Sequence, residues 1–305
     1  MQKSSPFNLL LLLPGTIWGI SFVVVELALE IIQPISMTLL RSVISVGFLY
    51  LGMRYFGGYL PRSWREWSPF IGIAAFNQAM PFALTAWGQT YIDGGLASIL
   101  LSTNPLFTLL LAAIIFSDEH FTAPKVIGVV FGLVGIVTLI GREALSGLGV
   151  NIVAQLAVVA SALMYGIGAV LLRRLIPRQP KDLSPWGSRL RVITAQFMAA
   201  IVMLTPFAFW LEEPLGIQPT FAFWMYMLFL GVGVTLFATM VYFYLIEKLG
   251  ASTASTTVYL IPISGVLMGV LILNETLTRN MVIALLLILL GIYLSNRSPR
   301  ARTDA

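Results

Sequence analysis

The residues best suited to chemistry are amides, hydroxyls and rings repeated at helical spacing. Gln78, Phe82, Thr85 and Gln89 follow one another at intervals of four, three and four residues, which places them on one face of a helix. Amides and hydroxyls donate and accept hydrogen bonds, yet no acid, base or nucleophile converges with them, as catalysis would require. The stripe therefore indicates binding of a polar solute, and we do not expect an enzyme.

Matching stripes lie in the other half of the chain. Counting 157 residues on from the first stripe gives Thr235, Thr239 and Tyr242. Paired stripes predict a polar interior shared by both halves. For serine and threonine the alternative is interhelical hydrogen bonding, at about 0.6 kcal/mol each, whereas glutamine and tyrosine are larger than packing needs. A shorter pair of stripes consists of Ser98, Ser102 and Pro105 in the first half and Ser255, Tyr259 and Pro262 in the second.

Two aromatic residues, Trp18 and Tyr165, also occupy matching places in the two halves. Aromatic residues of membrane proteins usually mark the interface between lipid and water. These two lie well inside apolar runs, so we expect them to line the same interior. The interfacial position is the alternative.

Arg41 is the one basic residue buried within a predicted membrane span, because Arg191, which matches it in the second half, is counted with the cytoplasmic segment 173–191 at the very start of its span. A charge within a membrane is costly and indicates a functional position by default. Arg41 can hold a carboxylate of the solute by two parallel hydrogen bonds, or pair with Glu26. Snorkelling to the outer headgroups is the alternative. Glu26 and Asp93 are the candidate groups for a gate or for proton coupling.

The composition shows which solvent surrounds these residues. Of the 305 residues, 58% are hydrophobic and 10% are charged, and the mean hydropathy is +0.91, as is typical of membrane proteins. A span needs about 20 apolar residues to cross a hydrocarbon core of about 30 Å. The sequence predicts an all-α integral membrane protein with ten transmembrane helices, over residues 7–26, 35–56, 68–90, 95–116, 124–141, 150–172, 190–211, 221–246, 252–273 and 279–296.

The basic residues predict the orientation. All but three of the 18, namely Arg41, Arg142 and Arg279, fall on the cytoplasmic side if both termini are cytoplasmic. This bias follows the positive-inside rule, so it indicates a membrane topology and not a nucleic-acid partner. The absence of cysteine, the single His120 and the absence of a phosphate-binding loop predict no metal, no cofactor and no direct use of ATP.

The clearest repeat joins residues 99–122 to residues 256–278, at an offset of 157 that becomes 156 after a one-residue gap. Each copy has a proline, which is expected to kink its helix and free a carbonyl, then a glutamate in a surface turn and a threonine N-cap. The kink either lines a cavity or only shapes the bundle. The matched residues are Pro105 and Pro262, Glu119 and Glu275, and Thr122 and Thr278.

The repeat divides the chain into residues 1–148 and 149–298, followed by a cytoplasmic tail, 299–305. Each half has five predicted spans, and an odd number turns the second half upside down relative to the first. This inverted arrangement is typical of secondary transporters, whose binding sites lie near the midplane and open to each side in turn. Gly128, Gly132 and Gly135 share a face that predicts close helix packing, either within the chain or in a homodimer.

The sequence resembles the EamA-type proteins of the drug/metabolite transporter superfamily. The resemblance rests on the five-plus-five repeat, on "WGISF" in the first span, and on the paired segments "NPLFTLLLAAIIFSDEHFT" and "IPISGVLMGVLILNETLT". It covers essentially the whole chain. It implies export of amino acids or other small metabolites across a bacterial inner membrane, with the spans over 95–116 and 252–273 beside the substrate route.

We therefore expect a secondary transporter of small metabolites that works by alternating access. A flippase for lipids or lipid-linked sugars is an alternative, which would need a lateral opening toward lipid and more charge in its cavity. An intramembrane enzyme is a further alternative, which would need acids, histidine or a nucleophilic serine to converge within the spans.

Overall fold

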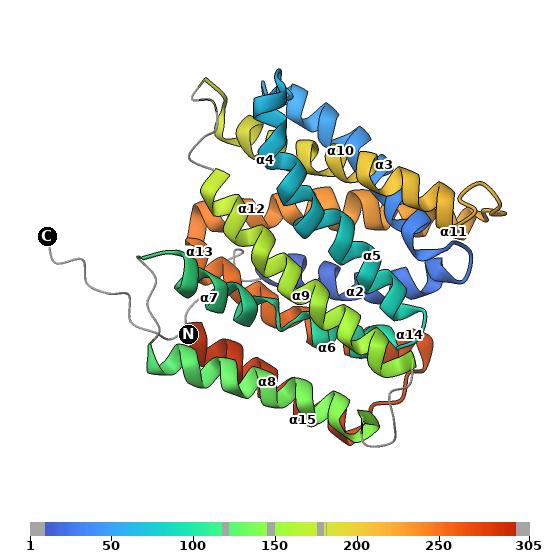
Figure 1. The fold of residues 1–305 in the computed structure, drawn as a ribbon, viewed down its shortest axis with the longest axis vertical. Coiled ribbons are helices and arrows are strands. Elements are labelled where there is room, and N and C mark those ends of the chain that lie inside the picture. The colour runs from blue at the N-terminus through green and yellow to red at the C-terminus, as the bar shows by residue number, and fades with distance from the viewer. Residues whose placement is uncertain (1–9, 118–121, 145–149, 176–179, 181, 297–305) are drawn as a thin grey trace, which may run out of the picture.

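The structure is a computed structural model that describes residues 10–117, 122–144, 150–175, 180 and 182–296. Within these residues the chain forms helices joined by turns, without β-strands, which confirms the predicted all-α fold (Figure 1). Glu119 and the predicted tail lie outside the described residues.

The helices follow one another with several interruptions. The first half contains α2 (Leu12–Leu29), α3 (Pro34–Tyr55), α4 (Trp64–Ala74), the π-helical η1 (Ala75–Ala79), α5 (Met80–Gln89), α6 (Gly94–Leu101), α7 (Asn104–Ile115) and α8 (Ala123–Ala144). The second half contains α9 (Val150–Leu175), α10 (Pro185–Leu211), α11 (Phe221–Leu228), the π-helical η3 (Phe229–Ala238), α12 (Thr239–Leu249), α13 (Ala251–Ala254), the 3-10 helix η4 (Ser255–Tyr259), α14 (Leu260–Leu273) and α15 (Arg279–Asn296).

Local sequence signals explain where several helices begin. Ser63, Ser184 and Thr220 each accept a hydrogen bond from the backbone N–H three residues on, as N-caps do. Pro185 lies in the first turn of α10, where a missing N–H costs little. α10 begins at Pro185, five residues before the predicted position 190, so Arg191 lies in the second turn of the helix and not at the boundary with the preceding loop.

Eight helical segments are long and apolar enough to cross a bilayer, judged by length and composition. The other two predicted spans, 68–90 and 279–296, also fall on helix in the structure. The first coincides with α4, η1 and α5, and the second with α15, which is apolar but shorter. The chain is therefore a multi-pass membrane protein.

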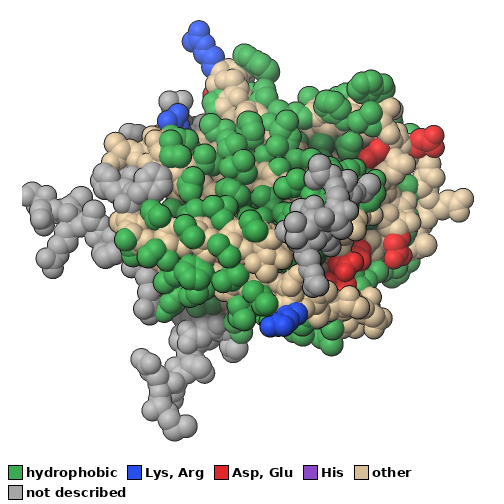
Figure 2. All heavy atoms as spheres, turned by 60° about the horizontal axis from the view of Figure 1, so that its bottom comes forward, with side chains coloured by type: hydrophobic (Ala, Val, Ile, Leu, Met, Phe, Trp, Pro, Cys, Tyr) green, Lys and Arg blue, Asp and Glu red, His purple; other side chains and the backbone are tan. Residues whose placement is uncertain are grey.

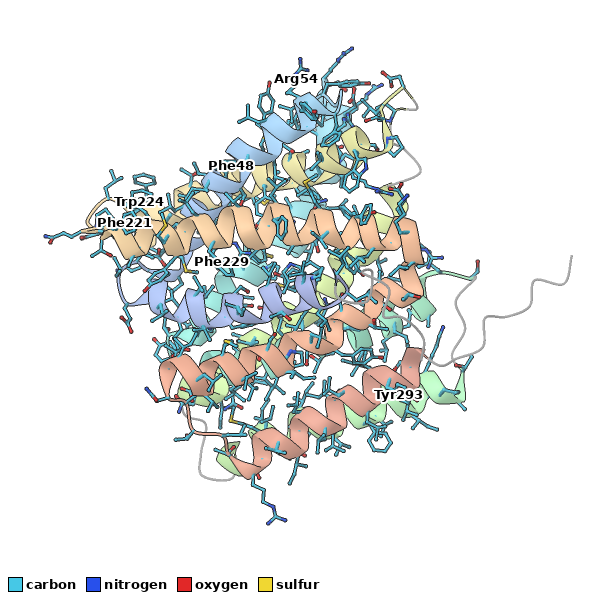
Figure 3. The ribbon with its side chains drawn as sticks, turned by 180° about the vertical axis from the view of Figure 1, so that it is seen from behind. Phe48, Arg54, Phe221, Trp224, Phe229 and Tyr293 are labelled. Carbon is cyan, nitrogen blue, oxygen red and sulfur yellow. The ribbon has the colours of Figure 1, made fainter. Side chains whose placement is uncertain are left out.

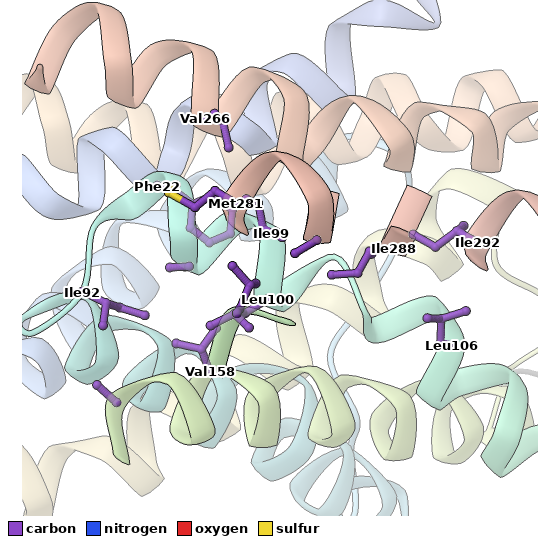
Figure 4. Packing of buried hydrophobic residues seen from close by; sticks show 14 residues of the cluster. Phe22, Ile92, Ile99, Leu100, Leu106, Val158, Val266, Met281, Ile288 and Ile292 are labelled. Atoms are coloured by element: carbon purple, nitrogen blue, oxygen red, sulfur yellow. The ribbon is translucent and has the colours of Figure 1, made fainter. Parts of the chain in front are cut away.

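Helices from the two halves pack on one another and do not form two separate bundles. α2 lies against η3 and α14, while α9 lies against α5, α6 and α7. α10 packs along α3, and α15 packs along α8 at the lower edge of Figure 1. Figure 4 shows a hydrophobic cluster to which α2, α6, α9, α14 and α15 contribute Phe22, Leu100, Val158, Val266 and Ile288.

The glycine face of α8 is covered within the chain. A Cβ atom at Gly128 would lie 2.4 Å from the backbone oxygen of Gly291 on α15. A Cβ atom at Gly132 would overlap Leu106 of α7, and one at Gly135 would lie 2.7 Å from Ile288 of α15. Intramolecular packing therefore accounts for these glycines.

The two ends of the bundle differ in charge. We call one end the acidic end, which is formed by turns 30–33, 90–93, 212–220 and 274–278. The basic end includes turns 56–63 and 182–184, and its basic residues are Arg62 in the first turn and Arg54, Arg65 and Arg189 on the adjoining helix ends. Figure 2 shows hydrophobic side chains over the middle of one face and acidic side chains gathered toward one end. Phe221 and Trp224 lie at one end of the molecule, away from Arg54 (Figure 3). An apolar belt between polar ends suits a bilayer.

Helix interruptions occupy matching positions in the two halves. At the offset of 157, η1 corresponds to residues 232–236, which lie within η3. The break between α6 and α7 comes just before Pro105, and η4 comes just before Pro262. A proline cannot donate the hydrogen bond that would continue the helix. Both prolines therefore follow an interruption of regular helix, close to where the sequence predicts a kink.

Candidate functional site

Arg41 of α3 is buried, and none of the described residues accepts a hydrogen bond from its guanidinium. The residue is 8% exposed, and its guanidinium lies 4.3 Å from the ring centroid of Phe82 on α5. Its Nε atom has no hydrogen-bond partner, and no described residue forms an ion pair with the guanidinium. A buried charge without a partner is unfavourable by several kcal/mol, roughly, unless a ligand or water supplies an acceptor. The guanidinium is therefore available to an anion.

An aromatic cluster adjoins this cation through Phe82. Phe82 packs against Tyr165 of α9 and Phe197 of α10, with ring centroids 6.1 Å apart in each pair. Tyr165 is also within electrostatic range of Arg41. Thr85, one turn beyond Phe82, has a buried hydroxyl without a hydrogen-bond partner. We call Arg41, Phe82, Thr85, Tyr165 and Phe197 the Arg41 group. The sequence analysis named all of these residues except Phe197.

Gln78 is bound to a partner that the sequence analysis missed. Gln78 Nε2 and Asn77 Nδ2, both in η1, donate to Gln196 Oε1 of α10 at 3.3 and 3.1 Å. Gln78 thus makes an interhelical hydrogen bond, the role that the sequence left open for smaller polar residues. Gln196 could have been found as an amide inside the apolar run 190–211.

Trp18 and Tyr242 meet between α2 and α12. Their ring centroids are 5.3 Å apart, with the edge of one ring toward the face of the other. Trp18 Nε1 also donates to the backbone oxygen of Val234 in η3, at 3.3 Å. Thr239 begins α12, one turn before Tyr242. The predicted residues Trp18 and Tyr242 are therefore in contact, and Trp18 is also hydrogen-bonded to η3.

The π-helical η3 borders both of these places. Ser45, one turn after Arg41, donates to the backbone oxygen of Gly231 at 3.1 Å. A Cβ atom at Gly231 would lie 3.4 Å from the backbone oxygen of Arg41. η3 thus contacts α3 near Arg41 and α2 at Trp18. Departures from α-helical geometry of this kind are frequent at functional sites.

Four other predicted residues have different surroundings. Ser102 Oγ donates to the backbone oxygen of Ile99 in its own helix, at 2.6 Å. Tyr259 packs against the hydrophobic cluster of Figure 4. Pro105 and Pro262 follow the helix interruptions described above. The contacts of the described residues do not join these four to the Arg41 group.

The sequence offered Glu26 as a possible partner of Arg41, but the structure shows no such pair. Glu26 Oε2 instead accepts a hydrogen bond from the backbone N–H of Gly94, at 2.7 Å, where α6 begins. Asp93, the other candidate for a gate, is the exposed residue just before α6. Gln89 Nε2 donates to the backbone oxygen of Phe22, at 2.9 Å. The free N–H groups of a helix start attract carboxylates, which explains the position of Glu26.

Glu275 is more buried than its predicted surface turn suggested. It is half-buried, and its two oxygens lie 3.1 and 3.0 Å from the backbone nitrogen of Gly95. Asn274 ends α14 with a left-handed φ of 56°, which reverses the chain and turns Glu275 back toward α6. Burial raises the pKa of Glu275 to about 7; the hydrogen bond from Gly95 opposes this rise, and the charges of Glu26 and Asp93 add to it.

A second buried arginine corrects the expectation that Arg41 is the only one. Arg191 of α10 is 2% exposed. Its Nε donates to the backbone oxygen of Tyr59 at 3.0 Å, and its Nη2 donates to Glu66. Arg191 therefore ties α10 to turn 56–63 at the basic end.

Known proteins share this sequence pattern over its whole length. An uncharacterized transporter of Archaeoglobus fulgidus is 27% identical over 94% of this chain and 97% of its own length. The uncharacterized transporter YoaV of Bacillus subtilis is 26% identical over 92% of each chain. A probable amino-acid metabolite efflux pump of Escherichia coli K12 is 24% identical over 94% of each chain.

A solved crystal structure has the same fold, with a TM-score of 0.64 at 19% identity over 94% of this chain and 95% of the other. The EamA-like transporter family matches residues 6–141 and again residues 152–297. These two matches cover the halves whose helices are interrupted at matching positions. The family and the relatives indicate a membrane transporter. The chain belongs to the EamA-like transporter family.

Proposed function

We propose that the protein is a secondary transporter that exports small carboxylate-bearing metabolites, such as amino acids, by alternating access. The observation that supports this most is the buried Arg41, whose guanidinium has no acceptor among the described residues. A carboxylate of the solute would supply that acceptor through two parallel hydrogen bonds. The Escherichia coli relative, named a probable amino-acid metabolite efflux pump, supports the same class of solute.

The surroundings of Arg41 suit a solute that also has an apolar part. Phe82, Tyr165 and Phe197 offer ring surfaces, and Thr85 offers a hydroxyl. Small-molecule sites combine such apolar walls with a few polar groups that orient the ligand. The Arg41 group contains a single cation, which favours a free metabolite over a lipid headgroup with several charges.

The repeat supports movement between two conformations. In the proposed topology, ten spans form two halves of five, so the halves are inverted relative to each other. The packing of α2 on η3 and α14 then mirrors the packing of α9 on α5, α6 and α7. The paired interruptions are points at which helices can bend. Rocking of one half against the other would expose the Arg41 group to each side in turn.

We assign the basic end to the cytoplasm and the acidic end to the outside of a bacterial inner membrane, with both termini cytoplasmic. The positive-inside rule supports this assignment. Reporter fusions test it: a fusion in turn 182–184 should report the cytoplasm, and a fusion at Glu213 should report the outside. Reversed sides would contradict the assigned orientation, and equal sides would contradict the crossing of the membrane by α10.

Exchange in liposomes tests the solute class. The purified protein is reconstituted with an unlabelled amino-acid mixture inside, and uptake of a labelled amino acid is measured. We expect carboxylate solutes to compete and the matching amines, which lack the carboxylate, to fail. Arg41→Lys keeps the charge but loses the planar fork, so it should slow exchange about tenfold at equal insertion. Equal competition by the amines would overturn the proposal.

A further inference from the structure

Two carboxylates at the acidic end lie outside the Arg41 group. Glu26 of α2 and Glu275 of the turn after α14 both lie at the first backbone N–H groups of α6. Glu26 Oε2 is 2.7 Å from the nitrogen of Gly94, and Glu275 Oε2 is 3.0 Å from the nitrogen of Gly95. We call Glu26 and Glu275 the carboxylate pair. The pair joins three segments that are far apart in the sequence.

Glycines make room for the pair. A Cβ atom at Gly95 would lie 2.4 Å from Glu275 Oε2, and one at Gly269 of α14 would also lie 2.4 Å from that oxygen. A Cβ atom at Gly94 would lie 3.0 Å from Glu26 Oε2. Any larger residue at these positions would displace a carboxylate. The chain therefore provides a close-fitting cradle for both acids.

Gln89 adds an independent observation beside the pair. Gln89 is 5% exposed, and its Oε1 has no hydrogen-bond partner. A Cβ atom at Gly94 would lie 3.2 Å from Gln89 Nε2 and 3.0 Å from Glu26 Oε2, so the amide and the carboxylate both lie beside Gly94. A buried acceptor without a donor is unfavourable. A carboxyl group that carries a proton would be a donor for it, whereas an ionised carboxylate would not.

We propose that the carboxylate pair of Glu26 and Glu275 binds a proton, and that this proton couples solute export to the proton gradient. The inference rests on the transporter function proposed above. A proton on one member of the pair relieves the repulsion between the two carboxylates. It also weakens their hydrogen bonds to α6, because a neutral carboxyl is a poorer acceptor than a carboxylate. Binding of the proton therefore weakens the hydrogen-bonded contacts that α2 and turn 274–278 make with the start of α6.

The charges around the pair favour proton binding near neutral pH. Burial raises the pKa of Glu275 to about 7 in spite of the hydrogen bond from Gly95, and Glu26 and Asp93 raise it further. Glu30 is the other charged group facing Glu26. A raised pKa means that the proton is bound below about pH 7 and released above it. In the described part of the chain, no three His, Cys, Asp or Glu residues are placed to hold a metal ion.

Solute accumulation driven by a pH gradient tests the proposal in liposomes that contain the full-length protein. The wild type should accumulate labelled amino acid against its gradient when a pH gradient is imposed, and a protonophore should abolish this. Glu275→Gln keeps an acceptor for Gly95 but cannot ionise. In this variant the accumulation driven by the pH gradient should fall at least about tenfold, whereas exchange with the same pH on both sides should be unchanged. Glu213→Gln, at an exposed position of the same end, is the matched control and should keep both.

The outcomes separate this inference from the proposed function. Wild-type exchange without driven accumulation would overturn proton coupling and leave the transporter function in place. Absence of exchange in the wild type would count against the proposed function itself. Driven accumulation that persists in Glu275→Gln would overturn the role of the pair. Loss of exchange in both Glu275→Gln and Glu26→Gln would also overturn it, because the pair would then maintain the fold or bind the solute.

Discussion

Arg41 and Arg191 lie on the second helix of each half, at matching positions, yet their surroundings differ. Both are buried, at 8% and 2% exposure. Arg191 donates to the backbone oxygen of Tyr59 and to Glu66 at the basic end. The Arg41 guanidinium lies over the ring of Phe82 and has no ion pair among the described residues.

The difference distinguishes an arginine whose charge is paired within the protein from one that, in the proposed function, binds the carboxylate of the solute. Arg191 connects α10 to turn 56–63, where Ser184 Oγ also donates to the backbone oxygen of Phe56. Its charge is buried because the protein supplies partners for it. A buried charge without partners is costly and indicates a functional position. The matching place in the repeat therefore does not determine the role; the neighbouring side chains do.

Arg41→Leu should have the largest effect. A charge-assisted hydrogen-bonded pair contributes about 3 kcal/mol at most, so exchange should fall by about two orders of magnitude. The amount of protein in the membrane should not fall, because leucine suits the bilayer. The measurement is exchange per inserted molecule. If Arg41→Leu exchanges like the wild type, Arg41 is an anchor at the headgroups and the comparison with Arg191 loses its meaning.

Arg191→Leu should instead reduce stability. The substitution leaves Glu66 and the backbone oxygen of Tyr59 without their donor, which costs on the order of 1–3 kcal/mol. The thermal unfolding midpoint in detergent should drop by several degrees, roughly 2–10 °C. Exchange per folded molecule should stay within about threefold of the wild type, since Arg191 does not belong to the Arg41 group. An unchanged midpoint together with weaker solute competition would mean that Arg191 binds the solute.

Trp18→Phe should have the smallest effect of the three. Phenylalanine keeps a ring against Tyr242 but loses the hydrogen bond to the backbone oxygen of Val234. Such an interhelical bond contributes about 0.6 kcal/mol, so exchange should slow less than about threefold. Trp224→Phe, at an exposed position of α11, is the matched control and should have no effect. A loss as large as that of Arg41→Leu would identify Trp18 as a direct solute contact.

The helical elements could be predicted because hydropathy and length are local properties. Among the described residues, eight of the predicted spans coincide with helical segments long and apolar enough to cross a bilayer, and the other two also fall on helix. One error was the start of α10, where charged and polar residues from Pro185 onward were assigned to the preceding loop. Pro105 and Pro262 marked the interruptions of their helices, since a missing N–H acts within one turn. The π-helical turns η1 and η3 carry no comparable local signal, and the sequence did not predict them.

The sequence by itself determined the membrane environment and the repeat, and it singled out Arg41 as a candidate, because each follows from composition, from self-similarity or from the cost of a charge in lipid. Only the tertiary structure decided the partners: Gln196 for Gln78, Glu66 for Arg191, and the first N–H groups of α6 for Glu26 and Glu275. These partners are between 68 and 180 residues apart in the chain. The role of a polar side chain in a membrane depends on which groups satisfy its hydrogen bonds, and packing between distant helices determines those groups.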